Sequence, residues 1–272
     1  MTNPVFFAPS SELAQLEAGD TFQLAGPEGH HARTVKRLTP GEPVDIVDGA
    51  GRRVSGEVAD GGGEALPVKI LAVLDEPVPS PSLILVQALA KGGRDELAIE
   101  AATELGIDAV VPWQAERSIV RWKDTKADKG RNKWQATVQA AAKQARRSRV
   151  PEVHPLVTGA GLVEFTALAD LALVLHEEAI TTLASLAADP AASPVLHAAN
   201  GRSGHPPDRS GFGNVPKILL IVGPEGGISN QEIGTLSDAG ATPVRLGTHV
   251  LRSSTAGPAA VSVLSHLLGR WD

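Results

Sequence analysis

The 272-residue sequence contains no cysteine. Disulfide bonds, thiolate metal sites and a cysteine nucleophile are therefore excluded, and a reducing compartment is favoured. The adjacent His30 and His31 have no third ligand at metal-site spacing, so we expect no bound metal. No apolar run is long enough to cross a membrane, and residues 1–7 lack the basic stretch and apolar core of a signal peptide. We expect a cytoplasmic protein without a membrane segment.

Positive charge is scarce outside one segment of the chain. The net charge is −6, yet residues 117–149 contain 11 Lys and Arg against only Asp124 and Asp128. A basic segment in an acidic chain favours a polyanionic partner such as RNA, and a solvated lysine-rich helix is the alternative. Apolar residues recur across the segment at helical spacing, which predicts a helix docked on the core. They are Trp134, Val138, Ala141, Ala142 and Ala145.

Residues 5–74 consist of short apolar runs separated by Gly, Pro and Asp. Valine alternates with polar residues in the runs 21–24, 44–49, 53–58 and 66–73, a pattern typical of half-buried strands in a small β-barrel. The residues Asp48–Gly51 predict a hairpin turn. Residues 30–38 interrupt this texture and predict one helix with Arg33 and Arg37 on a common face.

A stiff proline-rich linker, Pro77–Pro81, predicts a boundary between a first domain of residues 1–76 and a second domain of residues 80–272. Beyond it, apolar runs alternate with helical patterns, which indicates a parallel α/β sheet. We expect strands at 83–89, 109–112, 171–176 and 217–222. A helix over 95–105 would carry Leu97, Ala101 and Leu105 on one face and end at Gly106.

Two further stretches complete the second domain. Residues 189–215 are rich in Pro, Gly, Ser and Asn, so we expect a disordered insertion at about 190–215 that adds nothing to the core. The closing helix carries a wide apolar face suited to core or dimer packing. That face consists of Val261, Val263, Leu264, Leu267 and Leu268.

Two loops follow buried strands, at 223–229 (GPEGGIS) and 246–256 (LGTHVLRSSTA). Glycines in the first loop let backbone approach a ligand, and Ser229 with Glu232 forms a capping box. In the second, Ser254 or Thr255 is expected to cap a helix with Pro258 in its first turn. Neither loop fits a phosphate-cradle motif. Loops at the carboxyl ends of parallel strands usually bind ligands, although either loop alone fits an ordinary strand-to-helix turn.

The two loops together resemble the cofactor loops of the SPOUT methyltransferases, in which a deep trefoil knot surrounds S-adenosylmethionine. Residues 91–94 (KGGR), 102–106 (ATELG) and 116–117 (ER) resemble elements of the RsmE family of ribosomal RNA methyltransferases, as do 144–151 (QARRSRVP) and 30–38 (HHARTVKRL). The resemblance implies an α/β fold: a small amino-terminal PUA-like β-barrel, then a SPOUT α/β knot with a mainly parallel sheet. The chain departs from the family pattern at Ala101, often lysine, and at Ser254, usually glutamate.

The resemblance implies a homodimer that uses S-adenosylmethionine to methylate N3 of a uridine in 16S ribosomal RNA within the small subunit. It implies that Arg252 stabilises negative charge on the uracil, and binding of the methionine carboxylate or of a partner subunit's helix is the alternative. The implied cofactor contacts are Leu175, Glu177, Gly223, Pro224, Gly226, Ile228, Leu246, Leu251, Thr255 and Ala256. The implied RNA contacts are Arg33, Arg37, Lys91, Arg94, Arg117, Gln144, Arg147 and Arg149.

Two other functions stay open from the sequence. One is a SPOUT methyltransferase that acts on another RNA position, including a ribose 2′-oxygen. The other is an RNA-binding protein that has lost catalysis. Methylation at C5 of uracil is disfavoured, because enzymes that methylate C5 generally add a cysteine thiolate to C6 and this chain has no cysteine.

Overall fold

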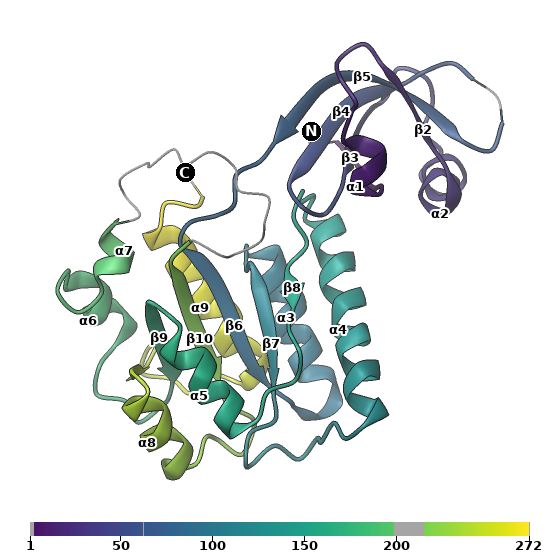
Figure 1. Cartoon of the computed structure of the whole chain (residues 1–272). Helices are drawn as coiled ribbons and strands as arrows, with labels where there is room; N and C mark the ends of the chain where they lie inside the picture. The colour runs from purple at the N-terminus through teal and green to yellow at the C-terminus, as the bar shows by residue number, and fades with distance from the viewer. Residues whose placement is uncertain (1–2, 62, 199–214, 272) are drawn as a thin grey trace. The chain divides into compact units, whose positions relative to one another are not determined.

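The computed structural model describes residues 3–61, 63–198 and 215–271 (Figure 1). The described residues form two compact units. The first contains the described part of Met1–Val78 together with Ala142–Val150, and the second contains residues 79–141, 151–198 and 215–271. The amino-terminal segment of the first unit thus ends at Val78, within the predicted linker. Residues 142–150, which the sequence analysis placed in the second domain, belong to the first unit instead.

The first unit is built on a curled five-stranded sheet with strand order β1-β3-β4-β5-β2. β1 pairs with β3 in parallel, and the other pairs are antiparallel. The predicted strands and hairpin are confirmed: Asp48 accepts hydrogen bonds from the backbone N–H groups of Ala50 and Arg52 and so closes the β3–β4 turn. The strands are β1 (Val5–Phe7), β2 (Thr21–Leu24), β3 (Pro43–Val47), β4 (Arg52–Val58) and β5 (Leu66–Asp75).

The predicted single helix at 30–38 is wrong. Helix α2 (Gly26–His30) continues into a π-helical turn, η1 (His31–Val35), and Arg37 has a left-handed backbone with φ of 56°. Arg37 therefore lies beyond the helix and does not share a helical face with Arg33. A short helix α1 (Ser10–Leu13) precedes β2 and buries Leu13 in the core of the unit.

The second unit contains a six-stranded parallel sheet with strand order β11-β9-β10-β6-β7-β8. The continuous apolar runs lie in its centre, where β6 is buried along its whole length, as expected for strands covered on both faces. The predicted parallel α/β sheet is confirmed, and the trefoil knot stays a prediction. The strands are β6 (Ser82–Ala88), β7 (Ala109–Trp113), β8 (Glu152–Val153), β9 (Leu171–Leu175), β10 (Lys217–Val222) and β11 (Ala241–Val244).

Helices cover both faces of this sheet (Figure 1). Helices α3 (Arg94–Glu104) and α9 (Ser253–Leu267) pack together on one face, and α5 (Gly159–Ala167) and α8 (Asn230–Asp238) lie on the other. The basic segment forms helix α4 (Thr125–Gln144), with Trp134 and Val138 fully buried, so the predicted docked helix is confirmed. No helix in the described ranges is both long and apolar enough to cross a bilayer.

The helix over 95–105 exists, but its predicted buried face is wrong. Ala98, Ile99 and Ala102 are buried in α3, whereas Leu97 is 56% exposed. The buried positions of α3 follow the i, i+3, i+4, i+7, i+8 spacing of one helical face that begins at Asp95, and Leu97 lies off that face. A positive φ of 102° at Gly106 follows the helix end, as predicted.

Two further predictions need correction. Arg252, not Ser254 or Thr255, is the amino-terminal cap of α9, and Pro258 lies beyond the first turn. The predicted insertion also begins too early: helix α7 (Pro194–Ala198) buries Leu196, and the Ser193 hydroxyl donates to the Leu186 carbonyl at 2.8 Å. The rest of that predicted insertion, at 199–214, lies outside the described residues.

Candidate functional site

A cavity of about 380 Å³ lies at the carboxyl ends of β9 and β10. A smaller cavity of about 60 Å³ shares several of its lining residues. Parallel strands end at the same edge of a sheet, so loops after neighbouring strands converge there. Of the predicted cofactor contacts, these line one or both cavities: Leu175, Glu177, Gly223, Pro224, Ile228, Leu246, Leu251 and Ala256.

The glycine-rich loop after β10 needs glycine at two positions, Gly223 and Gly227. A Cβ at Gly223 would lie 2.5 Å from Cγ1 of Ile228, so no larger residue fits without displacing a side chain of the cavity wall. Gly227 has φ of +72°, a left-handed conformation that L side chains rarely adopt. Its N–H donates to the carbonyl of Pro224 at 2.9 Å and closes the turn.

Glu225 connects this loop to the loop after β6. Its Oε1 accepts hydrogen bonds from the backbone N–H of Lys91 at 3.0 Å and from Nη1 of Arg94 at 2.8 Å. Burial alone would raise the pKa of Glu225, but the hydrogen bonds from its own backbone, Arg94 and Lys91 outweigh it, so the pKa is lowered. Arg94, predicted as an RNA contact, thus lines the cavity as part of an ion pair.

The opposite side of the glycine-rich loop is held by the loop after β7. Nη1 of Arg117 donates to the Gly226 carbonyl at 3.2 Å, and the backbone N–H of Glu116 donates to Glu232 at 2.8 Å. Glu232 also completes the predicted capping box with Ser229, which is confirmed. Gly226 does not line either cavity: a Cβ there would lie 3.3 Å from Cβ of Arg117. The missing side chain at Gly226 leaves room for the loop that carries Arg117.

The second predicted loop ends at the amino terminus of α9, which faces the larger cavity. Arg252 and Ser253 line that cavity, and the carbonyl of Arg252 accepts from the N–H of Ala256 at 2.9 Å. The first turn of a helix presents unpaired N–H groups and a partial positive charge, so an anionic group is favoured there. Thr255, a predicted cofactor contact, is exposed and lines neither cavity.

His176 lines both cavities and was absent from the predicted site. Its Nδ1 accepts a hydrogen bond from the N–H of Glu178 at 3.3 Å. Its position between Leu175 and Glu177 was the available signal. Glu225 was likewise missed, although it stands inside the glycine motif.

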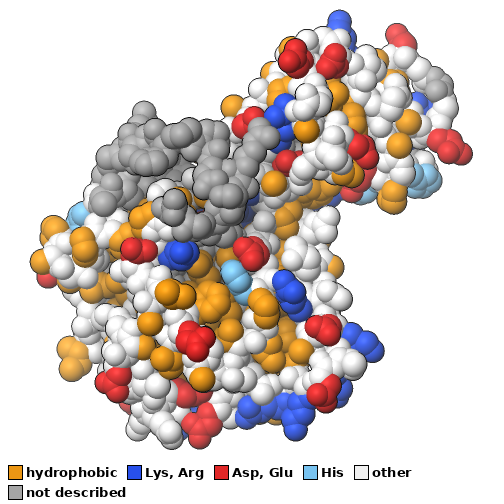
Figure 2. Space-filling model, in the orientation of Figure 1, with side chains coloured by type: hydrophobic (Ala, Val, Ile, Leu, Met, Phe, Trp, Pro, Cys, Tyr) orange, Lys and Arg blue, Asp and Glu red, His pale blue; other side chains and the backbone are white. Residues whose placement is uncertain are grey.

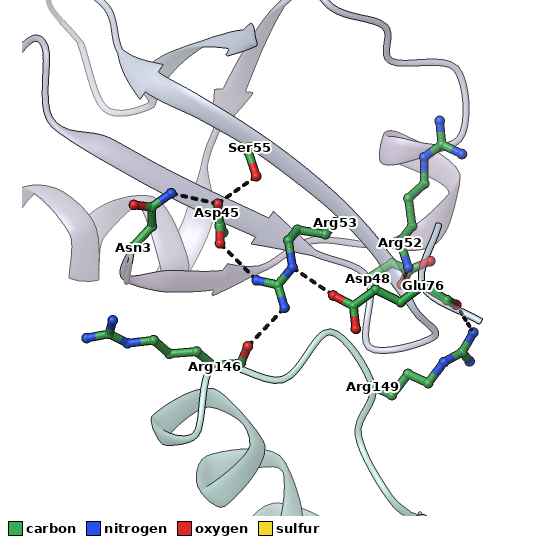
Figure 3. Close-up of polar contacts among 9 residues, drawn as sticks. All are labelled: Asn3, Asp45, Asp48, Arg52, Arg53, Ser55, Glu76, Arg146 and Arg149. Carbon is green, nitrogen blue, oxygen red and sulfur yellow. Dashed lines mark hydrogen bonds and ion pairs between the residues drawn. The ribbon is translucent and has the colours of Figure 1, made fainter. Parts of the chain in front are cut away.

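The predicted RNA contacts fall into both units. Lys91, Arg94 and Arg117 belong to the second unit, and Arg33, Arg37, Gln144, Arg147 and Arg149 to the first. Arg33 donates to the Gly61 carbonyl at 3.3 Å, and Arg149 donates to the Glu76 carbonyl at 2.7 Å (Figure 3). The Arg149 guanidinium also packs against Gly51, where a Cβ would lie 2.3 Å from its Nη2. Arg149 is therefore part of the packing of the first unit.

The basic segment extends into the second unit. Figure 2 shows Lys and Arg side chains over the beginning of α4 and the loop before it. The exposed members in this part of the chain are Arg121, Lys123, Lys126, Lys129, Arg131 and Lys133. Lys133 pairs with Glu96 at 2.6 Å, and this ion pair raises the pKa of Lys133. Clustered cations of this kind suit a polyanion.

Two other features bear on what the site could bind. Among the residues that the structure describes, no group of three or more His, Asp or Glu side chains could hold a metal ion. A separate cavity of about 440 Å³ lies between α5 and α8, with Trp113, Leu162 and Leu236 in its lining. This cavity shares no lining residue with the cavity at the strand ends. Neither the glycines of the loop after β10 nor the amino terminus of α9 lines it, so we assign the site to the strand ends.

Comparisons with known proteins show the family to which the chain is related. A family profile described as an RNA methyltransferase domain matches residues 77–265, and one described as an RNA methyltransferase PUA domain matches residues 24–71. The chain is 39% identical to ribosomal RNA small subunit methyltransferase E of Mycobacterium tuberculosis, over 94% of this chain and 90% of the relative. It is 28% identical to the Bacillus subtilis protein of the same name, over 93% and 92% of the two chains.

A solved structure also matches nearly the whole chain. The crystal structure of a ribosomal RNA small subunit methyltransferase E from Neisseria gonorrhoeae, bound to S-adenosylmethionine, is similar with a TM-score of 0.73. The two sequences are 26% identical, and the match covers 98% of each chain.

Proposed function

Because the chain belongs to the family of ribosomal RNA small subunit methyltransferase E, we propose that it methylates N3 of a uracil in 16S ribosomal RNA with S-adenosylmethionine. The target that the family resemblance gives is uracil 1498. The cavity at the ends of β9 and β10 carries the proposal, because a glycine-rich loop, a helix amino terminus and two arginines converge there. The partner is the small ribosomal subunit, and the place of action is the cytoplasm.

The residues of the cavity fit S-adenosylmethionine. The left-handed Gly227 and the crowded Gly223 leave a wall of backbone that a flat adenine ring can approach. The carboxylate of Glu177 suits ribose hydroxyls, and the apolar side chains of Leu246 and Leu251 suit the adenine. When bound, S-adenosylmethionine supplies a methyl group already activated by its sulfonium.

Methyl transfer then requires an aligned, deprotonated nucleophile more than covalent help from the protein. Arg252 is placed to favour the uracil anion, since a nearby cation lowers the pKa of an acid. Its position beside the first turn of α9 adds the helix's partial positive charge. The alternative role for Arg252, binding the methionine carboxylate, predicts weaker cofactor binding on substitution. Slower transfer at saturating cofactor identifies the role toward uracil.

The absence of cysteine supports a nitrogen or oxygen target over C5 of uracil. The test incubates the protein with S-adenosylmethionine and small subunits lacking the modification, in which uridine carries tritium at C5. Methylation at N3 retains the tritium and blocks pairing with adenine, so reverse transcriptase stops at the modified base. Release of tritium into water would refute the N3 assignment. Retained tritium, methyl incorporation and no stop would assign the ribose 2′-oxygen instead.

A homodimer and a trefoil knot belong to the same proposal. Sedimentation equilibrium gives the mass of the particle, and a mass near 28.2 kDa at micromolar concentration would contradict the dimer. If the protein binds RNA but transfers no methyl group, it is better described as an RNA-binding protein that has lost catalysis.

A further inference from the structure

Helix α4 ends in a Schellman motif whose left-handed position is occupied by arginine. The N–H of Arg147 donates to the carbonyl of Ala142 at 2.9 Å, and the N–H of Arg146 donates to that of Lys143 at 3.1 Å. These are the two hydrogen bonds that define the motif. Arg146 has φ of 58°, where glycine is the usual residue because it has no Cβ. Glycine would satisfy the backbone better than arginine.

A half-buried arginine of the sheet binds the carbonyl of this left-handed residue. Nη2 of Arg53 donates to the carbonyl of Arg146 at 3.0 Å (Figure 3). Its other nitrogens bind carboxylates: Nη1 pairs with Asp45 at 2.8 Å and Nε pairs with Glu76 at 2.8 Å. Burial alone would lower the pKa of Arg53, but its bonds to Glu76 and Asp45 outweigh it, so the pKa is raised. The Arg53 guanidinium is therefore charged and is held in place by contacts through all three of its nitrogens.

A second contact fixes the last turn of α4. Nζ of Lys143 lies 2.8 Å and 2.6 Å from the two carboxylate oxygens of Glu28, and 5.3 Å from the ring centroid of Phe6. The turn is thus held on two sides by the first unit. The side chain of Arg146 is exposed, and in Figure 3 it extends away from the Arg53 network.

We propose that Arg146 binds a phosphate of the RNA substrate, and that Arg53 is the residue that positions it. The inference rests on the proposed function. An unfavourable backbone conformation at a non-glycine residue points to a role for the side chain, and guanidinium binds phosphate oxygens in a planar, bidentate manner. A rigid turn reduces the entropy lost when the side chain binds RNA. The sequence pattern had selected Gln144, Arg147 and Arg149 and passed over Arg146.

The alternative is that Arg146 only stabilises the carboxyl end of α4 through its charge, as cations do at helix ends. The two roles predict different melting temperatures for Arg146→Gly. If the charge only stabilises the helix end, its loss lowers the melting temperature. If the role is RNA binding, glycine relieves the left-handed strain, and the melting temperature is unchanged or rises by about 2–4 °C. RNA affinity falls by about threefold to tenfold, and the slope of log K against log salt decreases by about 0.7–0.9.

The assay measures binding to small subunits lacking the modification, at several salt concentrations, and cofactor affinity by calorimetry. Arg146→Lys keeps the charge and should retain most of the salt slope. Lys69→Gln is the matched control, because it removes one exposed cation of the same unit from strand β5. Cofactor affinity should stay unchanged in all of them. An Arg146→Gly protein with wild-type RNA affinity and salt slope would overturn the proposal.

The positioning role of Arg53 has its own test. Arg53→Lys keeps the positive charge but loses the forked guanidinium, so RNA affinity should fall about threefold. In the Arg146→Gly background the same change should have no further effect on RNA affinity, because the side chain it positions is gone. Equal losses in both backgrounds would mean that Arg53 acts only through stability. If the wild-type protein neither binds nor methylates small subunits, the proposed function itself fails.

Discussion

Replacement of Gly227 by alanine tests whether the glycine-rich loop determines cofactor affinity. The left-handed φ of +72° costs a non-glycine residue about 1–2 kcal/mol. The nearest atom that the new Cβ would meet is Nη1 of Arg117 at 3.8 Å, an ordinary contact. The expected effect therefore comes from the backbone torsion alone, without a steric clash.

The magnitude follows from the population of the binding-competent loop. If the free protein relaxes to another conformation favoured by about 1–2 kcal/mol, the dissociation constant for S-adenosylmethionine rises by about 5-fold to 30-fold. The rate at saturating cofactor should change little, because bound cofactor restores the loop. Titration calorimetry in the presence of a chelator measures the dissociation constant and tests binding without metal.

Gly234→Ala is the matched control for this substitution. Gly234 lies in α8 with nothing within 4 Å of a new Cβ, so alanine should stabilise the helix by about 0.5–1 kcal/mol and leave cofactor affinity unchanged. A Gly227→Ala protein that binds cofactor like the wild type would refute the reasoning. A substitution at Gly226, an implied cofactor contact, is a poorer test, because that position faces Arg117 and not the cavity.

Three other outcomes can be stated. Glu225→Gln should lower the free energy of unfolding at pH 7 by about 1 kcal/mol, a small value because the paired side chains are 26% and 46% exposed. Because folding lowers the pKa of Glu225 below its ordinary value, this stability difference should vanish in acid denaturation as the pH falls through the folded-state pKa. Arg149→Ala should destabilise the first unit by about 1–2 kcal/mol in a denaturant titration, because it removes the bond to Glu76, whereas exposed Arg37→Ala should change stability by less than about 0.5 kcal/mol. Deleting residues 191–198 should lower the melting temperature in a thermal scan, because this deletion removes the buried Leu196.

The sequence by itself determined the elements whose causes are local. Apolar runs produced the buried strands of the parallel sheet, and valine alternation produced the strands of the first unit. The capping box at Ser229 and the glycine loop were legible because each depends on residues a few positions apart. The combination of short motifs sufficed to place the chain in its family.

The tertiary structure decided what each charged side chain contacts. Arg94 meets Glu225 across 131 positions, and Arg53 meets the carbonyl of Arg146 across 93. Such pairs leave no periodic signal, so the sequence could count the cations but not separate those held in the fold from those facing a ligand. The left-handed Arg37 and Arg146 were equally hidden, because the surrounding structure holds a backbone conformation that local preference disfavours.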